Sequence, residues 1–235
     1  PGFLKDGGEP PKIVRGAAED GYERLIAPSV EREVRAQLFD DASEQAIKMF
    51  EINLKPLLMQ PPVKNKITVG WDPAFRTGCK ICVVDGKGKV LDKTVVYPTP
   101  PQNKTEEAKK TLKALIEKYG VEVISCGNGT ASKESEIFIA ELIKEIKAET
   151  GREVGYVIVS EAGASVYSAS ALGAEEFPDY DVTARSAVSI ARRLQDPLAE
   201  LIKIDPKSIG VGQYQHDMNE KRLDSALGGV LEDCV

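Results

Sequence analysis

Asp72 is the acidic residue whose position in the chain best suits chemistry. Apolar residues alternate with small or polar ones over residues 67–71, which is the period of a β-strand, and Pro73 stops that strand directly after Asp72. A carboxylate at the open end of a central strand lies where α/β sheets commonly place their reactive groups. The simpler interpretation is that Asp72 only accepts hydrogen bonds from backbone amides of the following turn.

A second carboxylate, Glu161, stands in an equivalent position. It follows the apolar run 154–159, which predicts another strand, and it precedes an Ala- and Ser-rich segment that predicts a helix over residues 162–172. We expect the two strands to neighbour one another through the sheet, which places Asp72 and Glu161 at one edge. The alternative is that Glu161 is an ordinary acidic charge at a helix N-terminus.

Three other features suggest chemistry less strongly. Cys79 and Cys82 have the spacing of a metal or redox pair, but within one strand an odd spacing directs them to opposite faces, so we expect core packing. Residues 127–130, Gly-Asn-Gly-Thr, could cradle a phosphate, or could form a strand-to-helix turn with Ser132 as the helix cap. His216 is the only histidine, and we expect a hydrogen bond in a loop.

Periodicity and turn residues predict the elements that must position these side chains. The expected order is three antiparallel strands followed by two crossover units, which is the order of the RNase H-like fold. ATPase domains of the actin and sugar-kinase type begin in the same way. We expect strands over 67–72, 79–85, 89–97, 121–126 and 154–159, helices over 105–119, 132–149 and 162–172, and a last helix from Thr183 that restarts at Asp196-Pro197.

The segment before this sheet differs in character. Residues 1–28 are rich in Gly and Pro and predict a loop, after which Ser29 should cap a long helix that ends near Leu58, before Pro61-Pro62. The helix carries an apolar stripe from Val30 to Leu58. We expect the stripe to pack against the sheet domain or against the last helix, because unpacked helices are seldom stable in water.

Composition limits the classes of function. The chain has 235 residues, of which 42% are hydrophobic, which suffices for one or two domains with a sizeable core. The formal net charge of −6 gives no overall basic surplus for binding phosphate backbones, and no apolar run approaches the length of a membrane span. Four cysteines and no membrane segment predict a cytoplasmic location.

Six stretches of the sequence are specific enough to compare with known families: VGWDPAFRTGCK (69–80), YPTPPQN (97–103), GNGTAS (127–132), SEAGASVYSAS (160–170), SIARRLQDPLAEL (189–201) and IGVGQYQHD (209–217). These words resemble the YqgF (RuvC-like) domain of the Tex family of bacterial transcription accessory proteins, and the resemblance covers most of residues 22–235. Two positions depart from it: Ala74 stands where the family usually has Gly, and Trp71 where it usually has an aliphatic residue.

The resemblance implies a domain organisation. Residues 1–62 would end an N-terminal helical region, residues 63–205 would form a YqgF/RuvC-like domain of RNase H-like mixed α/β fold, and residues 206–235 would be a linker and the first helix of a helix-hairpin-helix region. Asp217 and Glu220 would form a capping box for that helix. Because its apolar stripe then stops at Val235, we expect the chain to be a fragment of a longer protein.

The resemblance also implies a metal site. RuvC-like nucleases hold two divalent metals with three or four carboxylates, and Asp72 and Glu161 match the first two acidic positions. The third position falls in residues 183–186, where Arg185 and Ser186 supply no carboxylate and Arg185 adds a positive charge. Asp179 or Asp181, just upstream, could replace the missing ligand.

Three functions remain open from the sequence. The first is a catalytically silent RNase H-like scaffold in a transcription-associated RNA- or DNA-binding protein, with no cofactor. The second is an active Mg²⁺- or Mn²⁺-dependent nuclease related to Holliday-junction resolvases. The third, an ATPase-type domain, would require a duplicated half for which the chain is too short. We expect weak nucleic-acid contacts from Arg76, Arg192 and Arg193, although the Arg192-Arg193 pair by default forms a solvated helix face, and partners in the transcription machinery.

Overall fold

The computed structural model describes residues 9–235, which fall into two compact units, one up to Met49 and the other Phe50–Val235. Helix α1 (Glu9–Gly21), a π-helical turn η1 (Tyr22–Ile26) and α2 (Ala27–Leu58) follow one another without a break. The expected loop is therefore wrong for residues 9–28, while residues 1–8 lie outside the described part. Pro10 and Pro11 occupy the first turn of α1, where the absence of a backbone N–H is tolerated.

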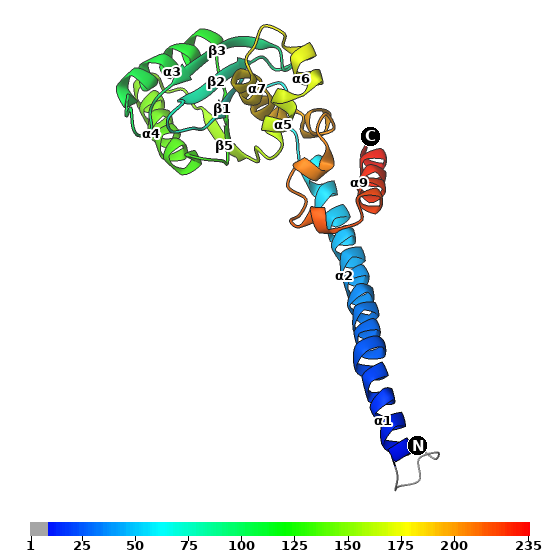
Figure 1. The fold of residues 1–235 in the computed structure, drawn as a ribbon. Coiled ribbons are helices and arrows are strands. Elements are labelled where there is room, and N and C mark those ends of the chain that lie inside the picture. The colour runs from blue at the N-terminus through cyan, green and yellow to red at the C-terminus, as the bar shows by residue number, and fades with distance from the viewer. Residues whose placement is uncertain (1–8) are drawn as a thin grey trace. The chain divides into compact units, whose positions relative to one another are not determined.

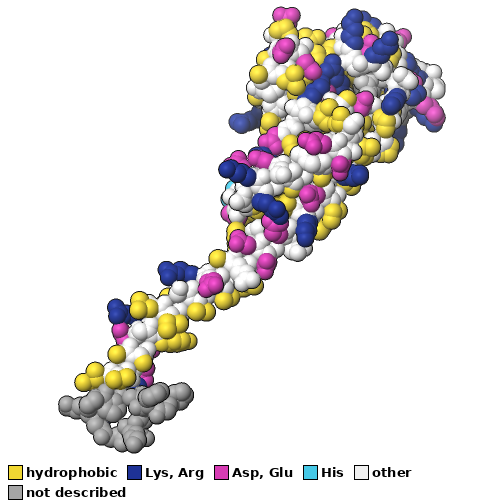
Figure 2. Space-filling view, turned by 90° about the vertical axis from the view of Figure 1, so that its right-hand side faces the viewer, with side chains coloured by type: hydrophobic (Ala, Val, Ile, Leu, Met, Phe, Trp, Pro, Cys, Tyr) yellow, Lys and Arg dark blue, Asp and Glu magenta, His cyan; other side chains and the backbone are white. Residues whose placement is uncertain are grey.

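The apolar stripe of α2 has two parts. Val30, Val34 and Leu38, in the first unit, are each more than half exposed, and Figure 2 shows such hydrophobic side chains along the N-terminal helices. Within the second unit Phe50, Leu54 and Leu58 are buried. Burial of the stripe is thus confirmed only for its C-terminal part and is wrong for the part from Val30 to Leu38.

The C-terminal part of α2 is anchored by the loop at residues 211–212. The ring of Phe50 lies so close to Gly212 that an added Cβ would come within 1.9 Å of Phe50 Cε1. Asn53 Nδ2 also donates a hydrogen bond of 3.0 Å to the Val211 carbonyl. Only glycine at position 212 therefore allows this contact.

A five-stranded sheet forms the centre of the second unit, with the strand order β3-β2-β1-β4-β5. The strands β1 (Thr68–Asp72), β2 (Cys79–Val84) and β3 (Val90–Val96) form an antiparallel meander, and β4 (Val123–Gly127) and β5 (Gly155–Val159) extend it in parallel from β1. This topology and the flanking helices confirm the predicted RNase H-like mixed α/β fold. The carboxyl ends of β1, β4 and β5 lie at the same edge.

The two faces of the sheet are covered differently (Figure 1). Helices α3 (Thr105–Tyr119) and α4 (Ser132–Thr150) pack on one face over large apolar side chains that include Trp71. Helix α7 (Val182–Gln195) packs on the other face with small residues such as Ala187 and Ala191. Cys79 belongs to the first cluster and Cys82 to the second, which confirms that the cysteines face opposite sides of β2.

Gly70 in β1 sets the distance between the sheet and α7. A Cβ at this position would lie 2.1 Å from the Ala187 carbonyl oxygen and 2.9 Å from Ala191 Cβ. The strand and the helix therefore touch backbone to backbone. On the neighbouring strand, Ser125 Oγ donates a hydrogen bond of 2.7 Å to the Ile190 carbonyl, which holds α7 from a second strand.

The structure differs from the prediction at two places among the remaining helices. The helix expected over 162–172 is two short helices, α5 (Ala164–Ala169) and α6 (Ala171–Glu176), because Ser170 is extended and its hydroxyl caps α6 by accepting from Gly173 N. The expected capping box is also wrong: Asn219 caps α9 (Glu220–Cys234), and Asp217 belongs to the short helix η3 (Gln215–Asp217).

The restart at Asp196-Pro197 is confirmed, since the Asp196 carboxylate caps α8 (Pro197–Leu201) and Pro197 occupies its first position. The chain then forms a 3-10 turn η2 (Pro206–Ser208) before η3. Across residues 9–235, no helix combines the length and the apolar character that crossing a membrane requires.

Candidate functional site

Asp72 lies at the carboxyl end of β1, directly beside α7. Its carboxylate accepts a hydrogen bond from the hydroxyl of Ser186, a buried residue in the first turns of α7. Burial raises the pKa of the Asp72 carboxyl above its ordinary value, while the Ser186 hydrogen bond and the positive charge of Lys80 lower it in part. Asp72 is therefore a half-buried carboxylate held by a helix hydroxyl.

Glu161 follows β5, and its carboxylate rests on the turn that follows β4. The Gly129 N–H donates a hydrogen bond to this carboxylate, and the Glu161 N–H donates one of 3.0 Å to Asn128 Oδ1. An added Cβ would lie 1.5 Å from Glu161 Oε1 at Gly129 and 2.5 Å from Glu161 Oε2 at Gly127. An added side chain at either glycine would therefore have to displace the Glu161 carboxylate.

This contact decides between the two interpretations of residues 127–130. Successive backbone N–H groups in such a turn form an anion-binding concavity, and here the bound anion is the protein's own carboxylate. Ser132 is the first residue of the helix that follows and not its cap as expected; Ala131, in a left-handed conformation, occupies the N-cap position without a side-chain hydrogen bond. The turn consequently serves to hold Glu161.

The strands that precede Asp72 and Glu161 are not neighbours as expected, because β4 lies between β1 and β5, but both carboxylates lie at the same edge of the sheet. Burial is the main cause that raises the pKa of the Glu161 carboxyl, and the negative charge of Asp72 is the second. Glu161 Oε2 is buried and has no hydrogen-bond partner. The two carboxylates therefore lie close enough for the charge of Asp72 to disfavour the charged form of Glu161.

The third position contains a hydroxyl and no carboxylate. In residues 9–235, no group of three or more His, Cys, Asp or Glu side chains is arranged to hold a metal ion. Asp181 instead caps α7, where it accepts 2.7 Å hydrogen bonds from Ala184 N and Thr183 Oγ1, and Asp179 is exposed in the preceding turn. The donor set is thus Asp72, Glu161 and the Ser186 hydroxyl.

Arg185 does not add its charge to this pair. Its guanidinium donates hydrogen bonds to the carbonyls of Phe177, at 3.1 Å, and Ser168, at 3.2 Å. The expected cation at the third position is therefore wrong, because the helix directs Arg185 toward the end of α6 while it directs Ser186 toward Asp72.

Arg193 supports the backbone on both sides of Glu161. Its side chain is 3% exposed, and Nη1 donates hydrogen bonds of 2.9 Å to the Ser160 carbonyl and 2.7 Å to the Ala162 carbonyl. Burial lowers the pKa of Arg193 to about 10. The expectation of a solvated Arg192-Arg193 face is wrong, since Arg193 is an internal clamp for the Glu161 segment.

The other two arginines that were predicted to contact nucleic acid, Arg192 and Arg76, lie in different places from Arg193. Arg192 is half-buried and donates to the Gly88 carbonyl at 2.8 Å and to Glu176 at 3.2 Å. Arg76 is exposed in the loop after Asp72. His216 lies in the short helix η3 and not in a loop as expected; it is exposed, and its Nε2 lies 3.3 Å from Asp217 Oδ1.

Sequence reasoning named three members of this site without their observed roles: Ser186, Arg193 and the glycine pair beneath Glu161. A signal for two of them was present. Ser186, Ser189, Ile190 and Arg193 follow one another at intervals of three or four residues, so they share one helix face. An arginine on an otherwise small and apolar face is the pattern of a buried, hydrogen-bonded guanidinium.

Comparison with known proteins agrees with the family resemblance that the sequence motifs indicate. Residues 66–195 match the family described as Tex protein YqgF-like domain. The chain is 57% identical over 224 residues to the uncharacterized protein YdcI of Bacillus subtilis, covering 95% of this chain and 31% of that protein. It is 53% identical over 210 residues to Protein tex of Bordetella pertussis, covering 89% and 26% respectively.

More distant relatives also match. The S1 RNA-binding domain-containing protein 1 of Homo sapiens is 43% identical over 224 residues, covering 95% of this chain and 22% of that protein. The yeast mitochondrial Holliday junction resolvase Ydc2 aligns with a TM-score of 0.37 and 12% identity over 81% of this chain and 97% of that chain, which is too distant to support an argument. The chain spans less than a third of the length of these curated relatives. Since the family match extends over more than half of the sequence, this chain belongs to the Tex protein YqgF-like domain family.

Proposed function

We propose that this chain is the RNase H-like part of a transcription-associated, nucleic-acid-binding protein, in which the carboxylate edge is a scaffold and not a nuclease centre. The observation that carries this proposal is the hydrogen bond between Ser186 and Asp72. Ser186 is a neutral hydroxyl in the segment where the family resemblance implies a third carboxylate, so its contact with Asp72 supports a scaffold. The Tex-named relatives support the transcriptional context.

The residues present do not fit a two-metal centre. Two dications a few ångströms apart require enough negative charge to hold them, and Mg²⁺ in particular dehydrates reluctantly and binds weakly to one or two carboxylates alone. Asp72 and Glu161 supply two carboxylates, and the raised pKa of each reflects an environment that disfavours charge. We therefore assign no catalytic step to a metal.

The second candidate is an active Mg²⁺- or Mn²⁺-dependent nuclease. The specific observation in its favour is that Asp72 and Glu161 lie close enough for the charge of one to raise the pKa of the other. A nucleic-acid phosphate could then supply the oxygens that the third position lacks.

One experiment separates these candidates. The chain is incubated with branched and single-stranded DNA and RNA in Mg²⁺ or Mn²⁺, beside an Asp72→Asn variant. We expect no cleavage from either protein. Cleavage by the parent chain that disappears in the Asp72→Asn variant would establish the nuclease and reject the scaffold.

A gain-of-function variant tests the same reasoning from the other side. Ser186→Asp restores a third carboxylate beside Asp72, so Mn²⁺ binding measured by calorimetry should become detectable. Gln213→Asp, at an exposed position outside the carboxylate site, adds the same charge and should leave binding unchanged. Equal Mn²⁺ binding by the parent chain and the Ser186→Asp variant would contradict the missing-ligand argument.

Direct nucleic-acid binding by this chain should be weak at physiological salt, because the net charge is −6. We expect contacts from exposed cations such as Arg76, a steep fall with salt, a cytoplasmic location and partners in the transcription machinery. Titration of a labelled strand at two salt concentrations tests the weak binding and its fall with salt. Tight binding that does not change with salt would overturn the proposal.

A further inference from the structure

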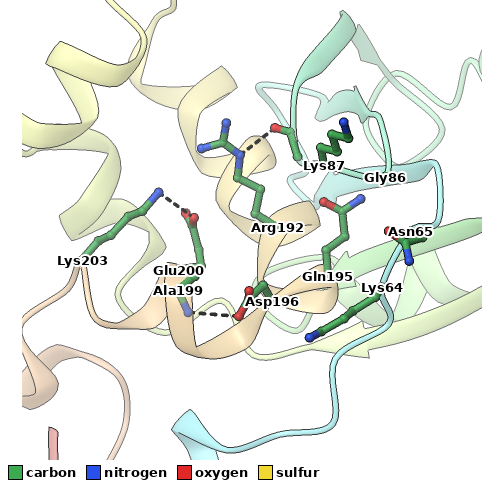
Figure 3. Close-up of a pocket in the computed structure, with 11 residues that line it drawn as sticks. Lys64, Asn65, Gly86, Lys87, Arg192, Gln195, Asp196, Ala199, Glu200 and Lys203 are labelled. Carbon is green, nitrogen blue, oxygen red and sulfur yellow. Dashed lines mark hydrogen bonds and ion pairs between the residues drawn. The ribbon is translucent and has the colours of Figure 1, made fainter. Parts of the chain in front are cut away.

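A cavity of about 480 Å³ lies at the end of the sheet opposite to the carboxylates (Figure 3). It is formed by the segment before β1, the turn between β2 and β3, the end of α7 and helix α8. Its volume falls within the range of small-molecule binding sites. We call it the turn cavity, and its polar lining residues include Lys64, Lys87, Arg192, Gln195, Glu200 and Lys203.

Gln195 places a fixed acceptor in the wall of the turn cavity. The side chain is 6% exposed, and its Nε2 donates to the carbonyls of Lys66 and Asp85, both at 2.8 Å, and faces Thr68 Oγ1 at 3.2 Å. These acceptors fix the orientation of the amide, because the reversed amide would place its oxygen against two carbonyls. Gln195 Oε1 is left buried without a hydrogen-bond partner.

Glu200 provides a second buried acceptor in the same wall. The side chain is 2% exposed, and its Oε2 pairs with Lys203 Nζ at 3.0 Å. Its Oε1 is buried and has no hydrogen-bond partner. A buried polar atom without a partner is costly, so two of them in one cavity wall indicate a ligand that carries hydrogen-bond donors.

The charge of the lining indicates an anionic part of the same ligand. The lining carries four cations, Lys64, Lys87, Arg192 and Lys203, against the two carboxylates of Asp196 and Glu200, in a chain with a net charge of −6. Arg192 and Lys203 are engaged with Glu176 and Glu200. Lys64 and Lys87 are exposed on the two loops that flank Gln195, so they can pair with an incoming anion.

We propose that the turn cavity binds a nucleotide. Its phosphate would pair with Lys64 and Lys87, and its ribose hydroxyls or base amino group would donate to Gln195 Oε1 and Glu200 Oε1. A dicarboxylate or inorganic phosphate at neutral pH has too few donors for the two buried acceptors, and an organic cation would be repelled by the surplus of lysine and arginine. The nucleotide is either free or one unit of a bound strand, and only in the latter case does the proposal rest on the nucleic-acid function above.

Calorimetric titration of the chain with adenosine monophosphate, inorganic phosphate and a short oligoadenylate tests the proposal. The Lys64→Glu/Lys87→Glu variant should weaken nucleotide binding at least about tenfold, because hydrogen bonds to charged groups contribute that much each. The Lys110→Glu/Lys133→Glu variant changes the same charge at exposed positions on α3 and α4 and should bind like the parent. Glu200→Gln should weaken adenosine monophosphate several-fold while leaving phosphate binding unchanged.

Each outcome decides a separate question. Lysine-dependent binding of free adenosine monophosphate supports the proposal even if no strand binds, in which case the nucleic-acid function fails alone. Lysine-dependent binding of the oligoadenylate alone also supports it and identifies a strand as the source. The proposal is overturned if inorganic phosphate binds as tightly as the nucleotide. It is also overturned if the oligoadenylate binds equally well to both double variants, and in that case the nucleic-acid function still stands.

Discussion

Helix α7 meets the sheet differently at its two ends. Near its start, Ser186 donates to Asp72, and Arg193, about two turns further along, holds the backbone carbonyls on both sides of Glu161. At its last residue, Gln195 holds two carbonyls with its nitrogen but leaves its oxygen toward a cavity lined by lysines.

The difference shows that the edge carrying the acidic motif is not the only edge with polar atoms left for a ligand. At the carboxylate edge the turn of Gly127 and Gly129 is already filled by Glu161. At the opposite edge two acceptors have no internal partner. At the carboxylate edge Glu161 Oε2 and Arg193 Nη2 also lack a partner, so the opposite edge is distinguished by the lysine-lined cavity beside its two acceptors.

The largest effect should come from a substitution that pushes α7 away from the sheet, because this disturbs both ends of the helix at once. Gly70→Ala places a methyl group 2.1 Å from the Ala187 carbonyl oxygen, and neither backbone can move independently. We expect a loss of about 3 kcal/mol in the free energy of unfolding, measured by urea denaturation. Gly155→Ala, where an added Cβ meets nothing within 4 Å, is the matched control. Equal stabilities of the two variants would contradict the close packing of β1 on α7.

A smaller effect should follow from removing the clamp at the carboxylate edge alone. Arg193→Met keeps the length of the side chain but leaves the Ser160 and Ala162 carbonyls without their donor, so we expect a loss of about 2 kcal/mol. Arg76→Met, at an exposed position, should change stability by less than about 0.5 kcal/mol. Thermal unfolding of both variants measures the difference, and a stable Arg193→Met protein would show that the clamp is dispensable.

The contact between the Glu161 carboxylate and the turn at Gly129 can be tested by a double-mutant cycle. Gly129→Ala should cost about 1–2 kcal/mol because the methyl group displaces the Glu161 carboxylate. Combined with Glu161→Ala, the same substitution should cost much less, since the space is then free. Denaturation of the two single variants and the double variant gives the coupling energy. Strictly additive losses would mean that Glu161 does not occupy the turn.

The smallest effect has the opposite sign. Burial raises the folded pKa of Asp72 above its ordinary value of 3.8, so this group stabilises the fold fully only below that value, and the contribution is lost as pH rises through the folded pKa. Asp72→Asn should therefore increase stability at neutral pH by about 0.5–1 kcal/mol. The gain should shrink as the pH falls toward 4 in thermal unfolding scans. A gain that is constant with pH would exclude titration of Asp72 as its cause.

The sequence predicted the fold from alternation and turns, and it predicted the meeting of Asp72 and Glu161 because both follow strands of one sheet. It could not predict that Arg193 is buried, since an arginine pair on a helix is usually solvated and only the three-dimensional packing of α7 shows which face is covered. The helix over residues 9–28 is not predictable from composition, because Pro and Gly usually break helices, whereas here Pro10 and Pro11 stand in a first turn. The sequence contains no signal for the role of Gln195, because the lack of a hydrogen-bond partner for its side-chain oxygen depends on where every neighbouring donor lies in the folded structure.

The backbone contact at Gly70 also has a mechanical consequence. A helix separated from a sheet by side chains can roll or slide as those side chains change rotamer, but α7 rests on β1 through main-chain atoms and is fastened to β4 by Ser125. Its 14 residues form a bar about 20 Å long. The helix and the strands beneath it therefore form one rigid unit, which keeps Ser186 and Gln195 at a fixed spacing between the two edges of the sheet.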